Sequence, residues 1–310
     1  MARLPDWGVW VAIAGLFVAA AILSPEFFRV FNLQDVLRRS SILGIVTMGQ
    51  VLVLLTGGLD LSVAAVIGAT AVAIAESTKP GGAGLIVGLI MMILIGAGVG
   101  ATNGLLVTKR RVPPFVATFG MFVVLEGARL AYTGGTASGS VPDGLRMFGR
   151  GTLLGLPWPT LTLILLVVGL TVFSRSTVSG RHLLMAGANE RMAHLSGIPV
   201  TRIKTAAYIG SSLLAVLAGI FFTADIGYVD RFLGRGADLD SISAALLGGT
   251  LFFGGEGSFI GAAAGAFLIA ALFNIIVLNG LAIEWQLVAK GLVLIAAVGL
   301  QTLGRRAAGA

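Results

Sequence analysis

Long apolar runs separated by short polar segments make up most of the chain. A helix needs about 20 apolar residues to cross the hydrocarbon core of a bilayer, within a range of about 17–25. We interpret the first run as a retained span, because no small-residue cleavage site of a signal peptide follows it. The pattern predicts about ten membrane helices, at residues 9–23, 41–56, 59–76, 85–107, 115–131, 160–173, 205–224, 241–253, 259–279 and 285–303.

The composition supports a membrane protein. Only 11% of the 310 residues are charged and 56% are apolar, with a mean hydropathy of +0.98, whereas soluble domains carry about 25% charged residues. We therefore expect an all-α polytopic fold in which residues 1–310 form a single transmembrane domain. The net charge of +7 is interpreted as a sign of membrane topology and of contact with anionic lipid, rather than of contact with nucleic acid.

The chain offers little for metal or cofactor chemistry. It has no cysteine, and its two histidines, His182 and His194, lie in one polar segment. No cluster of histidine and acidic residues has the spacing of metal ligands. We therefore expect neither a metal nor a cofactor bound by this chain.

Two of the apolar runs, at residues 41–56 and 241–253, are short, and a Gly-Gly pair follows each of them at residues 57–58 and 254–255. Short, glycine-interrupted segments at matching positions in two halves of a transporter are typical of discontinuous helices near a transport pathway. The pattern predicts such helices here and indicates an internal two-fold repeat.

Glycines recur at four-residue spacing in two parts of the chain. Such rows lie on one face of a helix and let two helix backbones approach closely in lipid. The sequence therefore predicts two close helix crossings, one through Gly96, Gly100 and Gly104 and the other through Gly257, Gly261 and Gly265.

Asp60 follows the first Gly-Gly pair and stands between two apolar runs. A carboxylate at membrane depth costs a few kcal/mol on insertion scales. Unpaired backbone N–H groups and the positive end of a helix offset such a cost. We interpret Asp60 as the cap of a broken helix, with direct contact to a transported solute as the alternative.

Polar residues within or beside the apolar runs, together with one tryptophan, are the candidates for a translocation pathway. For the two asparagines among them, a hydrogen bond between helices is the other interpretation, and the tryptophan is also typical of a membrane interface. Glu126 and Arg129 are expected to pair on one helix face, and Asn32 is expected to cap the second span with Asp35 at the third following position. The pathway candidates are Asp60, Ser62, Asn103, Thr118, Asn274 and Trp285.

The longest strongly basic segment, at residues 176–204, is expected on the cytoplasmic side as a coupling loop. Within it, Asn189 is a candidate N-cap for a short helix from Glu190 to Ser196, which Gly197 would end. A capped amphipathic helix of this kind suits docking in a groove of a soluble protein, and the alternative is a helix that lies on lipid. With ten spans, this orientation places both chain termini on the cytoplasmic side.

Five segments resemble, in order and spacing, the permease subunits of ribose-type sugar ABC importers, which belong with the branched-chain amino acid permeases. The resemblance covers most of the chain, and its most specific motifs are the first and third of these segments. They are GGLDLSVAAVIG (57–68), PPFVATFGMFVVLEGARLAYTGG (113–135), GANERMAHLSGIPVTRIK (187–204), AALLGGTLFFGGEGSFIGAAAGA (244–266) and WQLVAKGLVLI (285–295).

This resemblance implies a helical fold like that of the cobalamin-type importers, and a dimer of two copies or of two related permeases. It also implies a cytoplasmic ATPase that docks on the coupling loop, an extracytoplasmic sugar-binding protein and a location in a bacterial cytoplasmic membrane. Transport would proceed by alternating access. The residues expected to couple to the ATPase are Asn189, Glu190, Leu195, Ser196, Gly197 and Ile198.

The chain has no Gly-x4-Gly-Lys-Ser/Thr phosphate loop, so an ABC permease of this sequence needs the ATPase of another chain, which would use the ATP. The alternative is an ion-coupled secondary transporter of a small polar solute, which also uses broken helices and acidic groups near the middle of the membrane. A membrane-embedded enzyme lacks support, because the sequence shows no arrangement of a nucleophile with a base or a metal. The sequence favours a transport protein that is not itself an enzyme.

Overall fold

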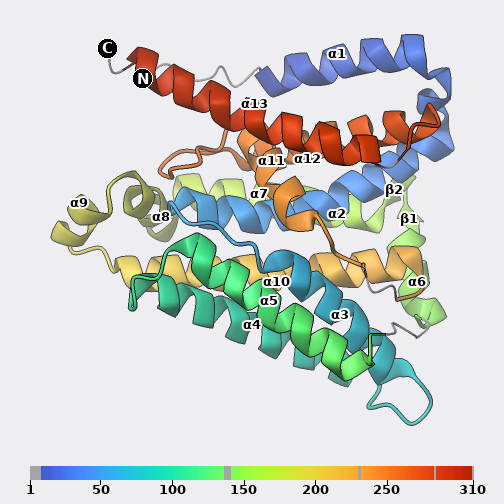
Figure 1. Cartoon of the computed structure of the whole chain (residues 1–310), viewed down its shortest axis with the longest axis horizontal. Coiled ribbons are helices and arrows are strands. Elements are labelled where there is room, and N and C mark those ends of the chain that lie inside the picture. Colours follow the sequence, from blue (N-terminus) through green and yellow to red (C-terminus); the bar gives the residue numbers. More distant parts are fainter. Residues whose placement is uncertain (1–7, 136–140, 230–231, 283, 309–310) are drawn as a thin grey trace.

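Helices dominate the structure (Figure 1), a computed structural model that describes residues 8–135, 141–229, 232–282 and 284–308. These residues also contain one short hairpin, in which β1 (Thr152–Leu153) pairs antiparallel with β2 (Leu156–Pro157). A 3-10 helix, η1, spans Pro25–Phe28. The α-helices are α1 (Gly8–Leu23), α2 (Val30–Leu55), α3 (Val63–Thr78), α4 (Leu85–Thr108), α5 (Pro114–Thr133), α6 (Asp143–Arg150), α7 (Trp158–Ser176), α8 (Val178–Ala188), α9 (Glu190–Leu195), α10 (Val200–Ile226), α11 (Ala237–Leu247), α12 (Phe259–Leu278) and α13 (Glu284–Ala308).

Length and apolar character decide which helices can span a membrane. Six of the described helices meet both conditions: α2, α4, α5, α7, α10 and α12. Two shorter apolar helices, α1 and α3, have 16 residues each. The all-α polytopic membrane fold is therefore confirmed. Ten spans remain a prediction, although each of the ten apolar runs overlaps a separate helix.

The two short apolar runs have different outcomes. α2 has 26 residues and begins at Val30, so the prediction of a short helix for the first run is wrong. Its polar turns stay helical because Asp35 pairs with Arg39 at 2.8 Å and with Arg38 at 3.4 Å, at the spacings of facing side chains. Asn32 consequently lies inside α2 and does not cap it. α11 has only 11 residues and confirms the second short helix.

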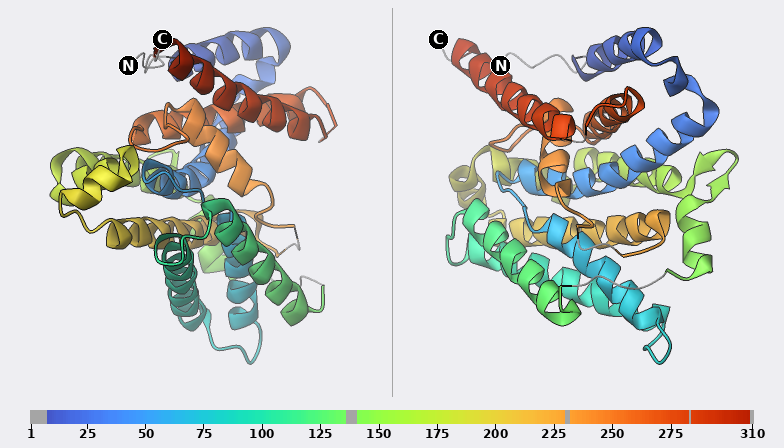
Figure 2. Two further views of the ribbon diagram at one scale, coloured as in Figure 1. Left: turned by 60° about the vertical axis from the view of Figure 1, so that its left-hand side comes forward. Right: turned by 45° about the vertical axis from the view of Figure 1, so that its right-hand side comes forward.

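α10 runs through the middle of the molecule, with α3, α4 and α5 on one side and α1, α12 and α13 on the other (Figures 1 and 2). The first row of glycines brings α4 against it. A Cβ atom added to Gly100 would lie 2.5 Å from the Cα of Ile209, and one added to Gly104 would lie 2.6 Å from the Cα of Thr205. The predicted close crossing is confirmed, because the two backbones leave no room for side chains there.

The second row of glycines packs α12 against α11. A Cβ atom added to Gly261 would collide with the carbonyl group of Gly248, and one added to Gly265 would collide with that of Ala244. Gly257, which precedes α12, is similarly enclosed. This crossing is also confirmed, and it explains how a helix as short as α11 is held in place.

The connections between helices gather at two opposite edges of the molecule (Figure 1). One edge, which we call the α8–α9 edge, carries α8, α9 and the connection from α4 to α5, and α13 ends on this side. The opposite edge, which we call the hairpin edge, carries α6, β1, β2 and the connections α1–α2 and α12–α13. The long helices run between these edges, as spanning helices must.

Candidate functional site

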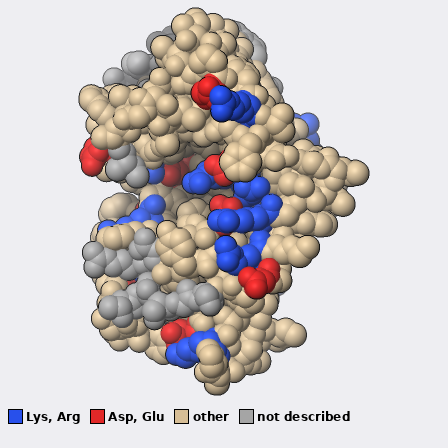
Figure 3. Space-filling model, turned by 90° about the vertical axis from the view of Figure 1, so that its right-hand side faces the viewer, with Lys and Arg blue, Asp and Glu red and all other residues tan. Residues whose placement is uncertain are grey.

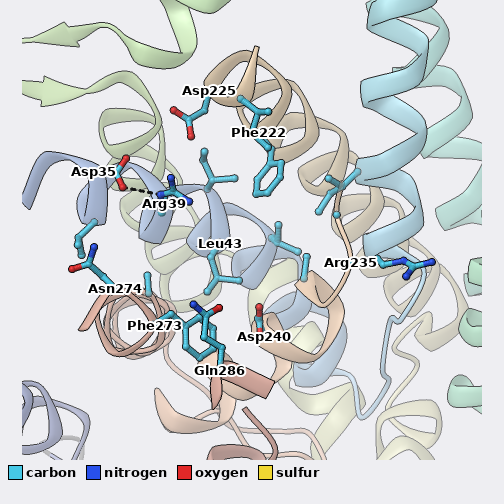
Figure 4. A pocket seen from close by; sticks show the side chains of 18 of the residues that line it. Asp35, Arg39, Leu43, Phe222, Asp225, Arg235, Asp240, Phe273, Asn274 and Gln286 are labelled. Carbon is cyan, nitrogen blue, oxygen red and sulfur yellow. Dashed lines mark hydrogen bonds and ion pairs between the residues drawn. The ribbon is translucent and has the colours of Figure 1, made fainter. Parts of the chain in front are cut away.

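A cavity of about 360 Å³ lies among α2, α10, α11, α12 and the first turn of α13. We call it the α2–α12 cavity (Figure 4). Helical spacing places one face of α2, including Asp35, Arg39 and Leu43, along one wall, and one face of α12, including Phe273 and Asn274, along another. These residues lie near the beginning of α2 and the end of α12, so the cavity belongs to the half of the molecule nearer the hairpin edge.

Charged side chains of both signs surround the α2–α12 cavity. Asp35 pairs with Arg39 within α2, and Asp225 at the end of α10 lies 3.8 Å from Arg38 and 3.9 Å from Arg150. Figure 3 shows acidic and basic side chains gathered around a hollow on the face of the hairpin edge. Most of these charges are paired, so the wall offers hydrogen-bond donors and acceptors with a limited net field, which suits an uncharged polar solute. Arg235, which also lines the cavity, lies over the Phe232 ring.

Asp240 of α11 places a buried carboxylate group in the wall of the cavity. Its Oδ2 accepts a hydrogen bond from the Lys290 Nζ of α13 at 2.7 Å. Its Oδ1 is buried and has no hydrogen-bond partner among the described residues. The ammonium group of Lys290 also lies 5.0 Å from the centre of the Phe273 ring. The ion pair therefore ties α11 to α13, and the second carboxylate oxygen is an enclosed acceptor without a described partner.

Three of the predicted pathway residues form a buried network outside the lining of the cavity. The Oδ1 of Asp60 accepts from the Ser62 N–H at 3.0 Å and from the Ser62 Oγ at 2.6 Å, and its Oδ2 accepts from the Ser211 Oγ at 2.9 Å. The Asn103 Nδ2 donates to the Ser62 Oγ at 3.0 Å. Asp60 thus bonds a backbone N–H just before α3, in agreement with a role at a helix end. Contact with a solute remains a prediction, and in this conformation all four residues are enclosed.

The other three pathway candidates lie in different surroundings. Thr118 is buried in α5, where its Oγ1 donates to the carbonyl oxygen of Pro114 at 2.9 Å. Trp285 is 57% exposed at the start of α13. Of the six pathway candidates, all of them described residues, Asn274 is the one that lines the α2–α12 cavity. Its side chain also forms hydrogen bonds with that of Asn32, which join α12 to α2.

The α8–α9 segment has the predicted capped helix. The Oδ1 of Asn189 accepts from the Met192 N–H at 3.0 Å, so Asn189 is the N-cap of α9. Gly197 follows the helix with a φ of +78°, a conformation that glycine adopts without strain. Met192 is 57% exposed and Leu195 is 73% exposed. The segment therefore presents an apolar surface that nothing in the described chain covers.

The remaining coupling candidates hold this segment in place. Glu190 pairs with Lys204 of α10 at 2.7 Å, and the Ser196 Oγ donates to the Met192 carbonyl oxygen at 3.0 Å. Ile198 is buried against Ala193. A groove of about 690 Å³ lies beside α9 and carries the basic residues Lys109, His194 and Arg202.

Two other expectations concern an ion pair within α5 and the absence of a metal site. Glu126 and Arg129 pair at 2.6 Å within α5, as predicted, and the Arg129 side chain is only 4% exposed. Among the residues that the structure describes, no group of three or more histidine, cysteine or acidic residues could hold a metal ion.

Several polar residues of the cavity wall escaped prediction from the sequence. All of them except Gln286 lie in segments between the apolar runs, which resemble ordinary connections. For α2, a signal was present, because the charged residues continue the face of the apolar positions 42, 43 and 46 at helical spacing. The other residues come together only through folding. The residues concerned are Asp35, Arg39, Asp225, Arg235, Asp240 and Gln286.

Comparison with known proteins gives consistent matches along nearly the whole chain. The family model described as branched-chain amino acid transport system / permease component matches residues 32–298. The ribose import permease protein RbsC of Bacillus subtilis (strain 168) is 37% identical over 297 residues, covering 94% of this chain and 91% of the relative. RbsC of Escherichia coli (strain K12) is 35% identical, with coverages of 93% and 91%. The autoinducer 2 import system permease protein LsrC of Enterobacter sp. (strain 638) is also 35% identical, with coverages of 97% and 88%. No solved structure matches the chain.

Proposed function

The chain belongs to the family of branched-chain amino acid transport system permease components, and from this premise we propose that it is the transmembrane permease subunit of an ABC importer for a sugar or a sugar-like solute. The observation that carries the proposal is the family match over residues 32–298, which takes in all the helices around the α2–α12 cavity. The relatives are named for the import of ribose and of autoinducer 2, which supports a small polar solute.

The α2–α12 cavity is the proposed entrance of the translocation pathway. Its paired charges and the amide groups of Asn274 and Gln286 supply hydrogen-bond partners for hydroxyl groups, and the rings of Phe222 and Phe273 supply apolar surface. Such a mixture is typical of sites for small polar ligands. Asp60, Ser62, Asn103 and Thr118 belong to the half nearer the α8–α9 edge and would line a later part of the pathway, while Trp285 would lie near its entrance.

The partners follow from the same proposal. A separate ATPase binds the exposed face of α9 and uses the ATP, so this chain binds no cofactor and is not an enzyme. A second permease subunit, identical or related, completes the transporter, and an extracytoplasmic binding protein delivers the solute. ATP-driven closure of the ATPase changes which side the pathway faces. The basic groove beside α9 favours an acidic patch on the ATPase.

The proposed location is a bacterial cytoplasmic membrane, with the α8–α9 edge and both chain termini in the cytoplasm. The position of the end of α13 on that side supports it, as does the direction of α1, which runs toward the hairpin edge. The basic cluster at residues 109–111 supports it as well. Ten spans, one transmembrane domain over residues 1–310, an internal repeat and a cobalamin-importer-like arrangement belong to the same proposal. Direct contact between the two Gly-Gly turns supports a repeat, because equivalent elements of two halves then meet.

Reconstitution in liposomes tests the proposal. We expect uptake of radiolabelled ribose only when the cognate ATPase, its ATP and the cognate binding protein accompany this permease. Autoinducer 2 is the second solute to test, because a relative is named for its import. Uptake by the permease alone, driven by an ion gradient, would support the secondary transporter instead, which family membership disfavours.

A further inference from the structure

Three segments that are distant in the sequence meet at the end of α8. They are the end of α2 at Leu55, the connection from α11 to α12 at Gly254 and Gly255, and the last residues of α8, Gly187 and Ala188. The Gly255 N–H donates a hydrogen bond to the Leu55 carbonyl oxygen at 3.0 Å. The turn after α2 and the turn before α12 are therefore joined by their backbones.

Gly187 lies directly against this hydrogen bond. A Cβ atom added to Gly187 would collide with the Leu55 carbonyl oxygen and would lie 2.8 Å from the Gly255 nitrogen, which are the acceptor and the donor of the bond. A Cβ atom added to Gly254 would lie 2.6 Å from the Gly57 nitrogen and 3.1 Å from the Gly187 carbonyl oxygen. The contacts at this point are between backbone atoms of α8 and of the two turns. A movement of α8 therefore cannot be absorbed by a change of side-chain rotamer.

α8 is also packed firmly on both sides of this contact. Leu183 belongs to an apolar cluster with Leu55 and Phe259, the residues next to the two turns. Ala186 belongs to a second cluster with Ala193 and Ile198, which anchors α9. Because interiors packed in this way transmit displacement rather than yield to it, α8 and α9 can move as one unit against the turns.

We infer that Gly187 is the positioning residue through which the α8–α9 segment acts on both Gly-Gly turns during transport. The inference rests on the proposed function, because it takes α9 as the element that receives the ATPase. A displacement of α9 carries the Gly187 backbone against the turns at residues 57–58 and 254–255. The first turn leads into the Asp60 network and α3, and the second leads into α12, a wall of the α2–α12 cavity. One contact therefore moves two elements of the pathway together.

The test follows access to the cavity and needs no knowledge of the solute. The chain has no cysteine, so Gln286→Cys introduces a single thiol in the wall of the α2–α12 cavity. In the complete complex with the ATPase and the binding protein, we measure how fast a membrane-impermeant thiol reagent labels it, with and without ATP. Gly187→Ala in this background should retain ATPase binding and ATP hydrolysis. Its ATP-dependent change in labelling rate should fall about fivefold or more, the lower end of usual coupling factors.

Gly169→Ala is the matched control, because it adds the same methyl group to a helix at a point with nothing within 4 Å. It should keep the full ATP-dependent change. Ala188→Val is a milder second variant, since Ala188 lies against Gly255 and is exposed. It should lose part of the change, and it replaces Gly187→Ala if the Gly187→Ala permease does not fold.

Two results would overturn the inference. One is a full ATP-dependent change in Gly187→Ala or, if the purified Gly187→Ala permease is not folded, in Ala188→Val. The other is loss of ATPase binding in Gly187→Ala, which would make Gly187 part of the docking surface. Neither result contradicts the proposed function, which fails only if the unaltered complex shows no ATP-dependent uptake.

Discussion

Asn32 and Asn274 donate hydrogen bonds to each other, from the Nδ2 of Asn32 to the Oδ1 of Asn274 at 3.0 Å and in the reverse direction at 2.9 Å. The pair joins the beginning of α2 to the end of α12, two walls of the α2–α12 cavity. Asn274 also lines that cavity. The amide pair therefore sets how far apart the two walls stand.

Asn274→Val should destabilise the protein. It removes both hydrogen bonds between Asn274 and Asn32, whose Nδ2 keeps its bond to the Phe27 carbonyl oxygen. Interhelical hydrogen bonds of this kind contribute about 0.6–2 kcal/mol in membrane proteins. Thermal unfolding of the purified permease in detergent measures the loss. The double variant Asn32→Val/Asn274→Val should be less destabilised than the sum of the single variants, because both remove one interaction. Unchanged stability of Asn274→Val would show that the pair does not hold the walls together.

Gly100→Ala and Gly98→Ala should differ although they lie in the same helix. A methyl group on Gly100 meets the backbone of α10 at 2.5 Å, whereas one on Gly98 meets nothing within 4 Å. Overpacking of this kind costs about 1–3 kcal/mol, while replacing an open helical glycine by alanine is favourable by about 1 kcal/mol. Thermal unfolding of both variants should place Gly100→Ala below the wild type and Gly98→Ala at or above it. Equal unfolding temperatures would refute the close crossing of α4 and α10.

Leu195→Asp should abolish binding of the cognate ATPase. The substitution puts a charge on the exposed apolar face of α9, and desolvating an unpaired carboxylate in a partner groove costs several kcal/mol. Co-purification with the ATPase measures the effect. Met147→Asp is the control, because Met147 is a similarly exposed apolar residue of α6 at the hairpin edge and should leave binding intact. If Leu195→Asp still binds the ATPase fully, α9 lies on lipid instead.

Asp240→Asn should lower transport while preserving the fold. The amide keeps the shape of the side chain but weakens the ion pair with Lys290 and removes a charged acceptor from the cavity wall. Hydrogen bonds to charged groups contribute about 1.5–3 kcal/mol, so we expect uptake of ribose to fall at least tenfold in the reconstituted complex. Asp143→Asn, at an exposed position of α6, is the control and should transport normally. Normal uptake by Asp240→Asn would remove Asp240 from the pathway.

The spacing of apolar and polar residues predicts much of this fold. Each of the ten apolar runs overlaps its own helix, because a chain in lipid must satisfy its backbone groups internally and helices do so locally. The two rows of glycines pointed correctly to the two close crossings, since four-residue spacing on one helix face is a local property. Asn189 was likewise recognisable as an N-cap from its neighbours alone.

The length of α2 and the lining of the cavity depend on contacts between distant segments. The polar turns of α2 lie outside its apolar run, and ion pairs of Asp35 keep them helical. Asn32 was expected to cap the helix but bonds Asn274, 242 residues away. Asp225 and Asp240 face one cavity only after α10 and α11 have packed. Gly187 opens the segment 187–204, but its neighbours in the sequence do not indicate a contact with Leu55 or Gly255. Its position against the Leu55–Gly255 hydrogen bond arises because three backbones converge there, and local periodicity carries no information about such a meeting.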